Sequence, residues 1–145
     1  DAVRWVFRGE GGSAPPPLIL DNGDAGTAST GTWLKSGGAD PYGGGSLYAK
    51  GSTATYTYTF GAAEAGTYEV LAWWTSVESR STQASYTIVH GGGGTAVKVN
   101  QRLNGGRWNS LGTFQLTGSA VVQIDAVPDG KSYCADAVSL RRLGD

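Results

Sequence analysis

The feature that most constrains this chain is the strict two-residue alternation in "STATYTYTF", residues 52–60. Ala54, Tyr56, Tyr58 and Phe60 alternate with threonines. Successive side chains of a strand point to opposite faces of a sheet, so this alternation predicts a strand with one buried face. No helical period extends over ten residues, the span of a short helix. The sequence therefore predicts an all-β fold.

Short apolar segments recur along the chain, each bounded by Gly, Asn, Asp or Pro. They are "LIL", "STATYTYTF", "AAEAGTYEVLAWW", "ASYTIVH", "TAVKVNQ", "RWNSLGTFQL", "AVVQIDAV" and "YCADAVSL". We expect a turn at Ala65-Gly66 and a hairpin around the glycines at 91–94. About eight short strands at regular spacing favour an antiparallel β-sandwich of jelly-roll type. The glycine-rich segment from Asp21 to Gly51 is expected to be a long loop.

The same patterns place one set of apolar side chains mostly inside the sandwich. The predicted core consists of Tyr56, Tyr58, Phe60, Tyr68, Val70, Trp74, Val97, Val99, Phe114, Leu116, Val122, Ile124, Val138 and Leu140.

Composition narrows the classes of partner. The 24 glycines and the 16% of charged residues suit an all-β protein with many tight turns. No segment is long and apolar enough to predict membrane insertion. The net charge is −1 and the basic residues are scattered, which argues against a nucleic-acid partner.

The 145 residues suit a single domain, which we place at residues 18–145. Residues 1–17 are predicted to be an N-terminal segment ending in a Pro/Gly linker, "GEGGSAPPP", and to be dispensable. Two observations keep open the alternative that residues 1–17 include the tail of an upstream repeat or dock on the domain. "DAVRWVF" shares Asp-Ala-Val with "DAVSLRR" near the C-terminus, as the tail of an upstream repeat would. Trp5, Val6 and Phe7 are large apolar residues that could dock on a sheet edge.

No catalytic set is evident, so no catalytic residues are predicted. His90 is the only histidine, and a solvent-facing strand end before a glycine run is the favoured interpretation. Cys134 is the only cysteine; it lies in an apolar strand pattern and is interpreted as a buried thiol. The acidic residues are dispersed along the chain, and no pair of carboxylates is marked as a hydrolase site.

No cofactor is predicted to be required, although calcium is considered. "DNGD" at residues 21–24 and Asp136 on the last strand could bind calcium through hard oxygen ligands. The favoured alternative is an Asx turn at residues 21–23 with solvent-facing acids.

Four segments together resemble a known family: "LDNGDAGTASTGTW", "AAEAGTYEVLAWWTSVESRSTQASYTIVHGGG", "VNQRLNGGRWNSLGTFQL" and "ADAVSL". In content and order they are similar to the golvesin C-terminal-like domain, also described as the xanthan-lyase carbohydrate-binding-like domain. The resemblance implies a non-catalytic β-sandwich of a modular, secreted bacterial protein. It also implies that other domains of the same chain are polysaccharide-degrading enzymes, peptidases or surface proteins, and that the ligand is a polysaccharide.

Residues 70–80, "VLAWWTSVESR", place two tryptophans side by side in a strand. Glu69 is unlikely to be buried without a partner, so its face, which Trp73 and Thr75 share, is predicted to be the outer one. Trp74 then lies in the core and Trp73 faces outward. The alternative is that the Asp21–Gly51 loop packs over Trp73 and covers it.

The predicted carbohydrate site consists of Trp73, Arg80, Asn104, Arg107 and Trp108. The indole rings would stack on the apolar face of a sugar. The arginines would pair with carboxylates if the polysaccharide is acidic. The alternatives are that Trp108 is core at a strand start and that Arg107 is an ordinary solvated charge.

Two functions therefore remain in view. The first is a non-catalytic carbohydrate-binding module, which exposed aromatic rings would favour. The second is a structural or protein-interaction domain of a secreted or cell-surface protein with no sugar site, which fully covered Trp73 and Trp108 would favour.

Overall fold

The computed structural model describes residues 16–51, 53–90 and 93–145, and this part of the chain folds into ten strands. They are β1 (Leu18–Asp21), β2 (Thr27–Thr30), β3 (Leu34–Ser36), β4 (Ser46–Lys50), β5 (Thr55–Trp73), β6 (Ala84–His90), β7 (Gly93–Val99), β8 (Trp108–Asp125), β9 (Ser132–Ala135) and β10 (Ala137–Gly144). These strands pair antiparallel, which confirms the predicted all-β antiparallel sandwich of jelly-roll type. The described residues contain no helix long and apolar enough to span a membrane.

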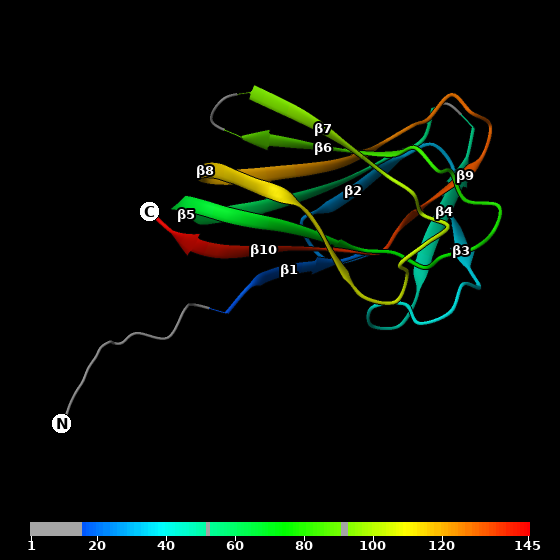
Figure 1. Cartoon of the computed structure of the whole chain (residues 1–145), viewed down its shortest axis with the longest axis horizontal. Helices are drawn as coiled ribbons and strands as arrows, with labels where there is room; N and C mark the ends of the chain where they lie inside the picture. The colour runs from blue at the N-terminus through cyan, green and yellow to red at the C-terminus, as the bar shows by residue number, and fades with distance from the viewer. Residues whose placement is uncertain (1–15, 52, 91–92) are drawn as a thin grey trace.

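Strands β5 and β8 form the frame of the sandwich. They pair along their full length, from Tyr56 opposite Ile124 to Trp73 opposite Trp108. Figure 1 shows both strands folding back at the end of the molecule that carries the C-terminus. One layer contains β2, the first half of β5, the second half of β8, β6 and β7; the other contains β1, β10 and the remaining halves. A small sheet of β3, β4 and β9 lies at the opposite end of the molecule.

The bend in β5 corrects one prediction. The sequence predicts a turn at Ala65-Gly66 between two strands, whereas β5 continues through this point as one strand. Irregularities in the pairing register between Phe60 and Ala63 and between Ala63 and Gly66 accommodate the change of direction. β-Bulges bend a strand in this way without ending it.

Gly66 is required at the bend by a close backbone approach. A Cβ atom at this position would lie 2.5 Å from the carbonyl oxygen of Gly144 and 2.7 Å from Nε of Arg142. We expect Gly66→Ala to lower the free energy of unfolding by about 1–3 kcal/mol, because one backbone segment must move. Gly61→Ala in the same bend is the matched control, since a Cβ there meets nothing within 4 Å. Urea denaturation measures both variants, and equal stabilities would contradict the prediction.

The core between the two layers largely matches the predicted set. Eleven of its fourteen members are buried: Tyr56, Tyr58, Phe60, Tyr68, Val70, Trp74, Leu116, Val122, Ile124, Val138 and Leu140. The other three, Val97, Val99 and Phe114, are partly buried and pack against the core. Cys134 is fully buried as predicted, and burial raises the pKa of its thiol.

The alternation around the double tryptophan is confirmed up to the end of the strand. Trp74 is 2% exposed, and Trp73 on the opposite face is half-buried. Thr75 is a correction, because the sequence places it on the outer face and the structure buries it completely. The strand ends at Trp73, so the two-residue alternation does not apply to Thr75.

The Asp21–Gly51 segment is also a correction. It is not one long loop, because β2, β3 and β4 lie within it. β2 pairs with β5 in the large sheet, whereas β3 and β4 belong to the small sheet. Leu18 begins β1, where the sequence predicts the first strand. The interpretations of residues 1–15 and of the hairpin loop at 91–92 lie outside the described residues.

Candidate functional site

Two of the predicted site residues form a cluster on the outer face of the β5–β8 ladder. Trp73 and Trp108 are directly opposite each other in register, with ring centroids 5.4 Å apart and an interplanar angle of 82°. Tyr42, from the segment between β3 and β4, contacts both rings. Its ring centroid lies 5.5 Å from that of Trp73 and 5.2 Å from that of Trp108. We call Tyr42, Trp73 and Trp108 the aromatic cluster. Edge-to-face contacts of this kind stabilise a cluster beyond the area they bury.

The sequence left two alternatives for Trp73, an outward-facing ring or a ring covered by the Asp21–Gly51 segment. The structure lies between the two. The segment after β3 does pack over Trp73, because Trp73 Nε1 donates a hydrogen bond to the carbonyl oxygen of Asp40 at 2.9 Å. Trp73 and Trp108 nevertheless both stay half-buried and are not fully covered. Their steep mutual angle means that the two rings do not form one flat platform. A sugar could therefore stack on one ring but not on both at once.

The turn before β8 adjoins the aromatic cluster and holds Asn104 and Arg107. A Cβ on Gly106 would lie 2.8 Å from Cβ of Asp40, so this turn packs against the segment that covers Trp73. Asn104 and Arg107 are both exposed, and Arg107 donates a hydrogen bond to the side-chain oxygen of Asn104. The structure thus brings four predicted residues to one region: Trp73, Trp108, Asn104 and Arg107.

Arg80, the fifth predicted residue, lies elsewhere, and its surroundings correct the expectation of a loop arginine beside the tryptophans. It is only 2% exposed. Its Nη2 donates to Ser36 Oγ at 2.8 Å, its Nη1 to Ser132 Oγ at 3.3 Å, and its Nε to the carbonyl oxygen of Thr75 at 3.2 Å. Its guanidinium carbon lies 5.6 Å from the centre of the Tyr48 ring. These contacts hold Arg80 at the small sheet and away from the aromatic cluster.

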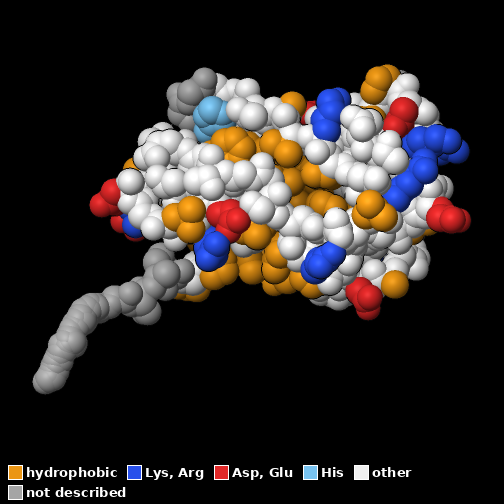
Figure 2. All heavy atoms as spheres, viewed as in Figure 1, with side chains coloured by type: hydrophobic (Ala, Val, Ile, Leu, Met, Phe, Trp, Pro, Cys, Tyr) orange, Lys and Arg blue, Asp and Glu red, His pale blue; other side chains and the backbone are white. Residues whose placement is uncertain are grey.

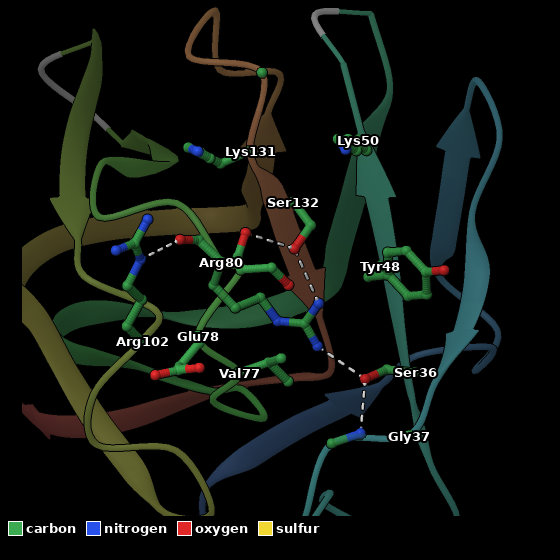
Figure 3. Close-up of a pocket in the computed structure, with 13 residues that line it drawn as sticks. Ser36, Gly37, Tyr48, Lys50, Val77, Glu78, Arg80, Arg102, Lys131 and Ser132 are labelled. Carbon is green, nitrogen blue, oxygen red and sulfur yellow. Dashed lines mark hydrogen bonds between the residues drawn. The ribbon is translucent and has the colours of Figure 1, made fainter.

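Arg80 forms part of a hollow of about 620 Å³ at the end of the molecule that carries the small sheet. We call it the basic pocket. Four cations and one carboxylate line it, together with an aromatic ring: Lys50, Arg80, Arg102, Lys131, Glu78 and Tyr48. Figure 3 shows the Arg80 guanidinium between Ser36 and Ser132 and facing Tyr48. Figure 2 shows Lys and Arg side chains gathered at this end of the surface.

The sequence does not reveal the basic pocket. Its lining comes from four separate parts of the chain: the β3–β4 region, the segment around Glu78, Arg102, and the turn before β9. Lys50, Arg102 and Lys131 are scattered in sequence, and only the folding of these segments brings them together. Ser132 joins three of these parts within the described chain, because it pairs with Lys50 in the β4–β9 ladder and forms an isolated bridge with Arg80.

A pair of carboxyl groups, from the buried Asp136 and the half-buried Asp21, lies next to the segment that carries Tyr42. Asp136 is completely buried; its Oδ2 accepts a hydrogen bond from the backbone N–H of Tyr42 at 2.9 Å. Its Oδ1 accepts one from Nδ2 of Asn22 at 3.2 Å, and its carboxyl is hydrogen-bonded to that of Asp21. Burial raises the pKa of Asp136 to about 8, and burial also raises the pKa of Asp21.

The carboxyl pair bears on the calcium expectation. Asp21 and Asp136 do come together, and the favoured alternative of an Asx turn with solvent-facing acids is wrong. The Gly23 N–H donates to the Tyr56 hydroxyl at 2.8 Å, and Asp136 is completely buried. Residues 21–24 instead form a turn in which the Asp24 N–H donates to the Asp21 carbonyl oxygen at 3.1 Å. Within the described residues, no group of three or more His, Cys, Asp or Glu side chains could hold a metal ion. Calcium at Asp21 and Asp136 stays a prediction.

Comparison with known proteins gives consistent results. Residues 18–142 match the model of the Golvesin C-terminal domain. Over 140 residues, 89% of this chain, the sequence is 36% identical to a xanthan lyase of Bacillus sp. strain GL1, and the match covers 15% of that protein. The chain thus spans a small part of this curated relative.

Solved structures show the same fold. The structure of Paenibacillus xanthan lyase matches 88% of this chain with a TM-score of 0.82 and 31% identity, over 13% of its own length. A family 35 carbohydrate-binding module from Clostridium thermocellum matches 89% of this chain with a TM-score of 0.64 and 12% identity, over 100% of its length. A CBM35 from Cellvibrio japonicus Abf62 matches 90% with a TM-score of 0.63 and 18% identity, over 99% of its length.

Proposed function

This chain belongs to the Golvesin C-terminal domain family, and we propose that it is a non-catalytic carbohydrate-binding module that directs a secreted bacterial multidomain protein to a polysaccharide. The match to a small part of a xanthan lyase supports the role of one domain among several. A module of this kind raises the effective concentration of its partner domain at the substrate and needs only weak affinity. Enzymatic activity would then reside in other domains of the same chain.

The basic pocket is the observation that carries this proposal. Its volume of about 620 Å³ lies within the ordinary range of small-molecule sites. Ser36, Ser79 and Ser132 add hydroxyl groups, and Tyr48 adds a ring to the lining. Hydrogen-bonding groups beside an aromatic ring suit a ligand that is polar at its hydroxyl groups and apolar on its C–H face.

The aromatic cluster offers a second surface for a longer chain of sugars. Trp73 and Trp108 keep their place in the proposed site as single stacking rings, with Asn104 and Arg107 as nearby polar groups. The alternative of a structural or protein-interaction domain with no sugar site would make both the aromatic cluster and the basic pocket elements of packing alone.

We expect Tyr48→Ala to weaken polysaccharide binding about tenfold without a large loss of stability, because the ring is part of the pocket wall. Affinity electrophoresis and isothermal titration calorimetry against soluble polysaccharides measure this, with thermal melting run alongside. Leu34→Ala is the matched control: Leu34 is the cross-strand neighbour of Tyr48, is 52% exposed and does not line the pocket.

Trp108→Ala in the same assay separates the two surfaces. A loss with Tyr48→Ala alone assigns binding to the basic pocket, and a loss with Trp108→Ala as well extends it to the aromatic cluster. If the wild-type protein binds none of a panel of acidic and neutral polysaccharides, the proposed function is wrong and the structural alternative stands.

A further inference from the structure

We infer that the basic pocket recognises a carboxylate group of the sugar, so that its ligand is a uronic acid residue of an acidic polysaccharide. This inference rests on the proposed function and specifies the ligand of the same pocket. It is carried by the environment of Arg80 and by the charges around it.

Arg80 is a buried cation without an anionic partner in the described part of the chain. Its guanidinium donates to the hydroxyl oxygens of Ser36, Ser132 and Thr75 and to the Thr75 carbonyl, all of which are neutral. A buried charge is ordinarily paired with an opposite charge, because desolvation is costly. Four donated bonds also leave one of its five N–H groups, on Nη1, without an acceptor among these residues. The guanidinium therefore has both the charge and a donor for an incoming anion.

The rim of the basic pocket is positively charged, as is Arg80 in its wall. Lys50, Lys131 and Arg102 are exposed and line the opening, against Glu78 as the one carboxylate of the lining. The chain as a whole has a net charge of −1, so this excess of cations is local. Arg102 is held in place because its Nε donates to the Arg80 carbonyl oxygen at 2.7 Å. A cleft lined by one sign of charge attracts ligands of the opposite sign.

The remaining lining favours a sugar over a bare anion. The Tyr48 ring lies against the Arg80 guanidinium, so an anion bound to Arg80 would lie next to an aromatic face. The serine hydroxyls at the wall can exchange hydrogen bonds with sugar hydroxyls. A uronic acid residue presents a carboxylate, hydroxyls and an apolar C–H face within one ring, which matches these three features together.

The test compares methyl β-D-glucuronide with methyl β-D-glucoside, and polyglucuronic acid with a neutral β-glucan, by calorimetry and by ¹⁵N chemical-shift titration. Sodium acetate at equal ionic strength controls for a bare carboxylate. The variant is the double substitution Lys50→Gln/Lys131→Gln, which alters exposed rim residues and leaves the Arg80 network intact. Lys35→Gln/Lys98→Gln removes the same charge from exposed positions that do not line the pocket.

We expect the wild-type protein to bind the glucuronide at least tenfold more tightly than the glucoside, with amide shifts at residues 36–38 and 79–81. The rim double variant should lose about three- to tenfold in affinity for the glucuronide, whereas the control double variant should match wild type. Affinity should also fall with added salt, because the rim cations are exposed.

Three results would overturn the inference. Equal affinity for the charged and neutral sugars would leave carbohydrate binding in place and remove carboxylate recognition. Equal losses in the two double variants would show a general charge effect, and equal shifts with acetate would show an anion site that does not read a sugar. Absence of binding to every polysaccharide would instead reject the proposed function itself.

Discussion

Replacing Trp74 with alanine is expected to lower the free energy of unfolding by about 3–5 kcal/mol, the range for a fully buried large aromatic side chain. Trp74 is 2% exposed and lies in the core beside Tyr86, at 6.3 Å between ring centroids. The substitution also removes the 2.9 Å hydrogen bond from Trp74 Nε1 to the carbonyl oxygen of Leu103. Loss of this bond adds to the cost of the cavity. Urea denaturation followed by fluorescence and circular dichroism measures the change.

Trp73→Ala is the matched control, because it removes the same side chain from the adjacent position on the opposite face. Trp73 is half-buried and contacts mainly the aromatic cluster. Its removal should lower the free energy of unfolding by about 1–2 kcal/mol, since this ring buries less apolar area than the ring of Trp74. Equal losses in the two variants would contradict the assignment of Trp74 to the core and Trp73 to the outer face.

The alternation of side chains made this part of the fold predictable. Within a strand, the parity of one charged residue, Glu69, is enough to orient its neighbours, and Trp73 and Trp74 follow it. The prediction fails at Thr75 because the strand has ended there and hydrogen bonds to Arg80 and Ser46 orient it instead. Local pattern therefore predicts faces of a strand, but not the residues that follow it.

The pairing of Trp73 with Trp108 could not be predicted from the sequence. The two strands change register three times along the ladder, including between Val70 and Leu71. Each irregularity displaces the partner of every later residue, and bulges leave little trace in a single sequence. The outward direction of Trp73 could be predicted, whereas that of Trp108 was left open. The direct contact of the two rings and the covering by Tyr42 could not be predicted.

The sequence predicts Arg80 as a carbohydrate-binding residue, but this prediction assumed an exposed side chain, which the structure does not show. A loop arginine after an aromatic strand indicated a solvent-facing charge, but the structure buries it at the small sheet. The partners that bury it, Ser36 and Ser132, lie 44 and 52 residues away. Contacts over such separations depend on tertiary folding, which short-range patterns do not report.

The carboxyl pair of Asp21 and Asp136 leads to the second large expected effect, a fall in the free energy of unfolding as pH rises from 5 to 8. Burial raises the pKa of Asp136 to about 8 in the folded protein, whereas an aspartate in the unfolded chain has an ordinary pKa of 3.8. The folded state therefore binds more protons between these values, and raising the pH favours unfolding. The lowered pKa values of Glu69 and Asp129 act below this window, and the raised thiol pKa of Cys134 acts above it.

We expect Asp136→Asn to remove this pH dependence and to be about 1–3 kcal/mol more stable than wild type at pH 8, the cost of an ionised buried group with incomplete compensation. The asparagine oxygen can still accept the bond from the Tyr42 N–H, and its amide can donate to Asp21. The 3.2 Å bond that Asp136 accepts from Asn22 Nδ2 is lost, because an amide nitrogen does not accept. Asp129→Asn is the control, because the pKa of Asp129 is lowered by the hydrogen bond from Ser81, so any loss of stability should be equal at pH 5 and pH 8. Thermal melts in chelator-containing buffers at constant ionic strength measure all three proteins.

Calcium and the proton would compete for the same two carboxyl groups, which allows the calcium prediction to be tested in parallel melts with calcium in place of the chelator. Added calcium can stabilise only the form in which Asp21 and Asp136 are both ionised, so its effect should grow from pH 5 to pH 8 and be absent in Asp136→Asn. A calcium-dependent rise in Tm of that kind would assign the pair to the metal. Wild-type stability that stays flat or increases between pH 5 and pH 8 without calcium would contradict the proton-sharing arrangement. The same carboxyl also accepts the backbone N–H of Tyr42, so it helps to fix the segment that carries this member of the aromatic cluster in either protonation state.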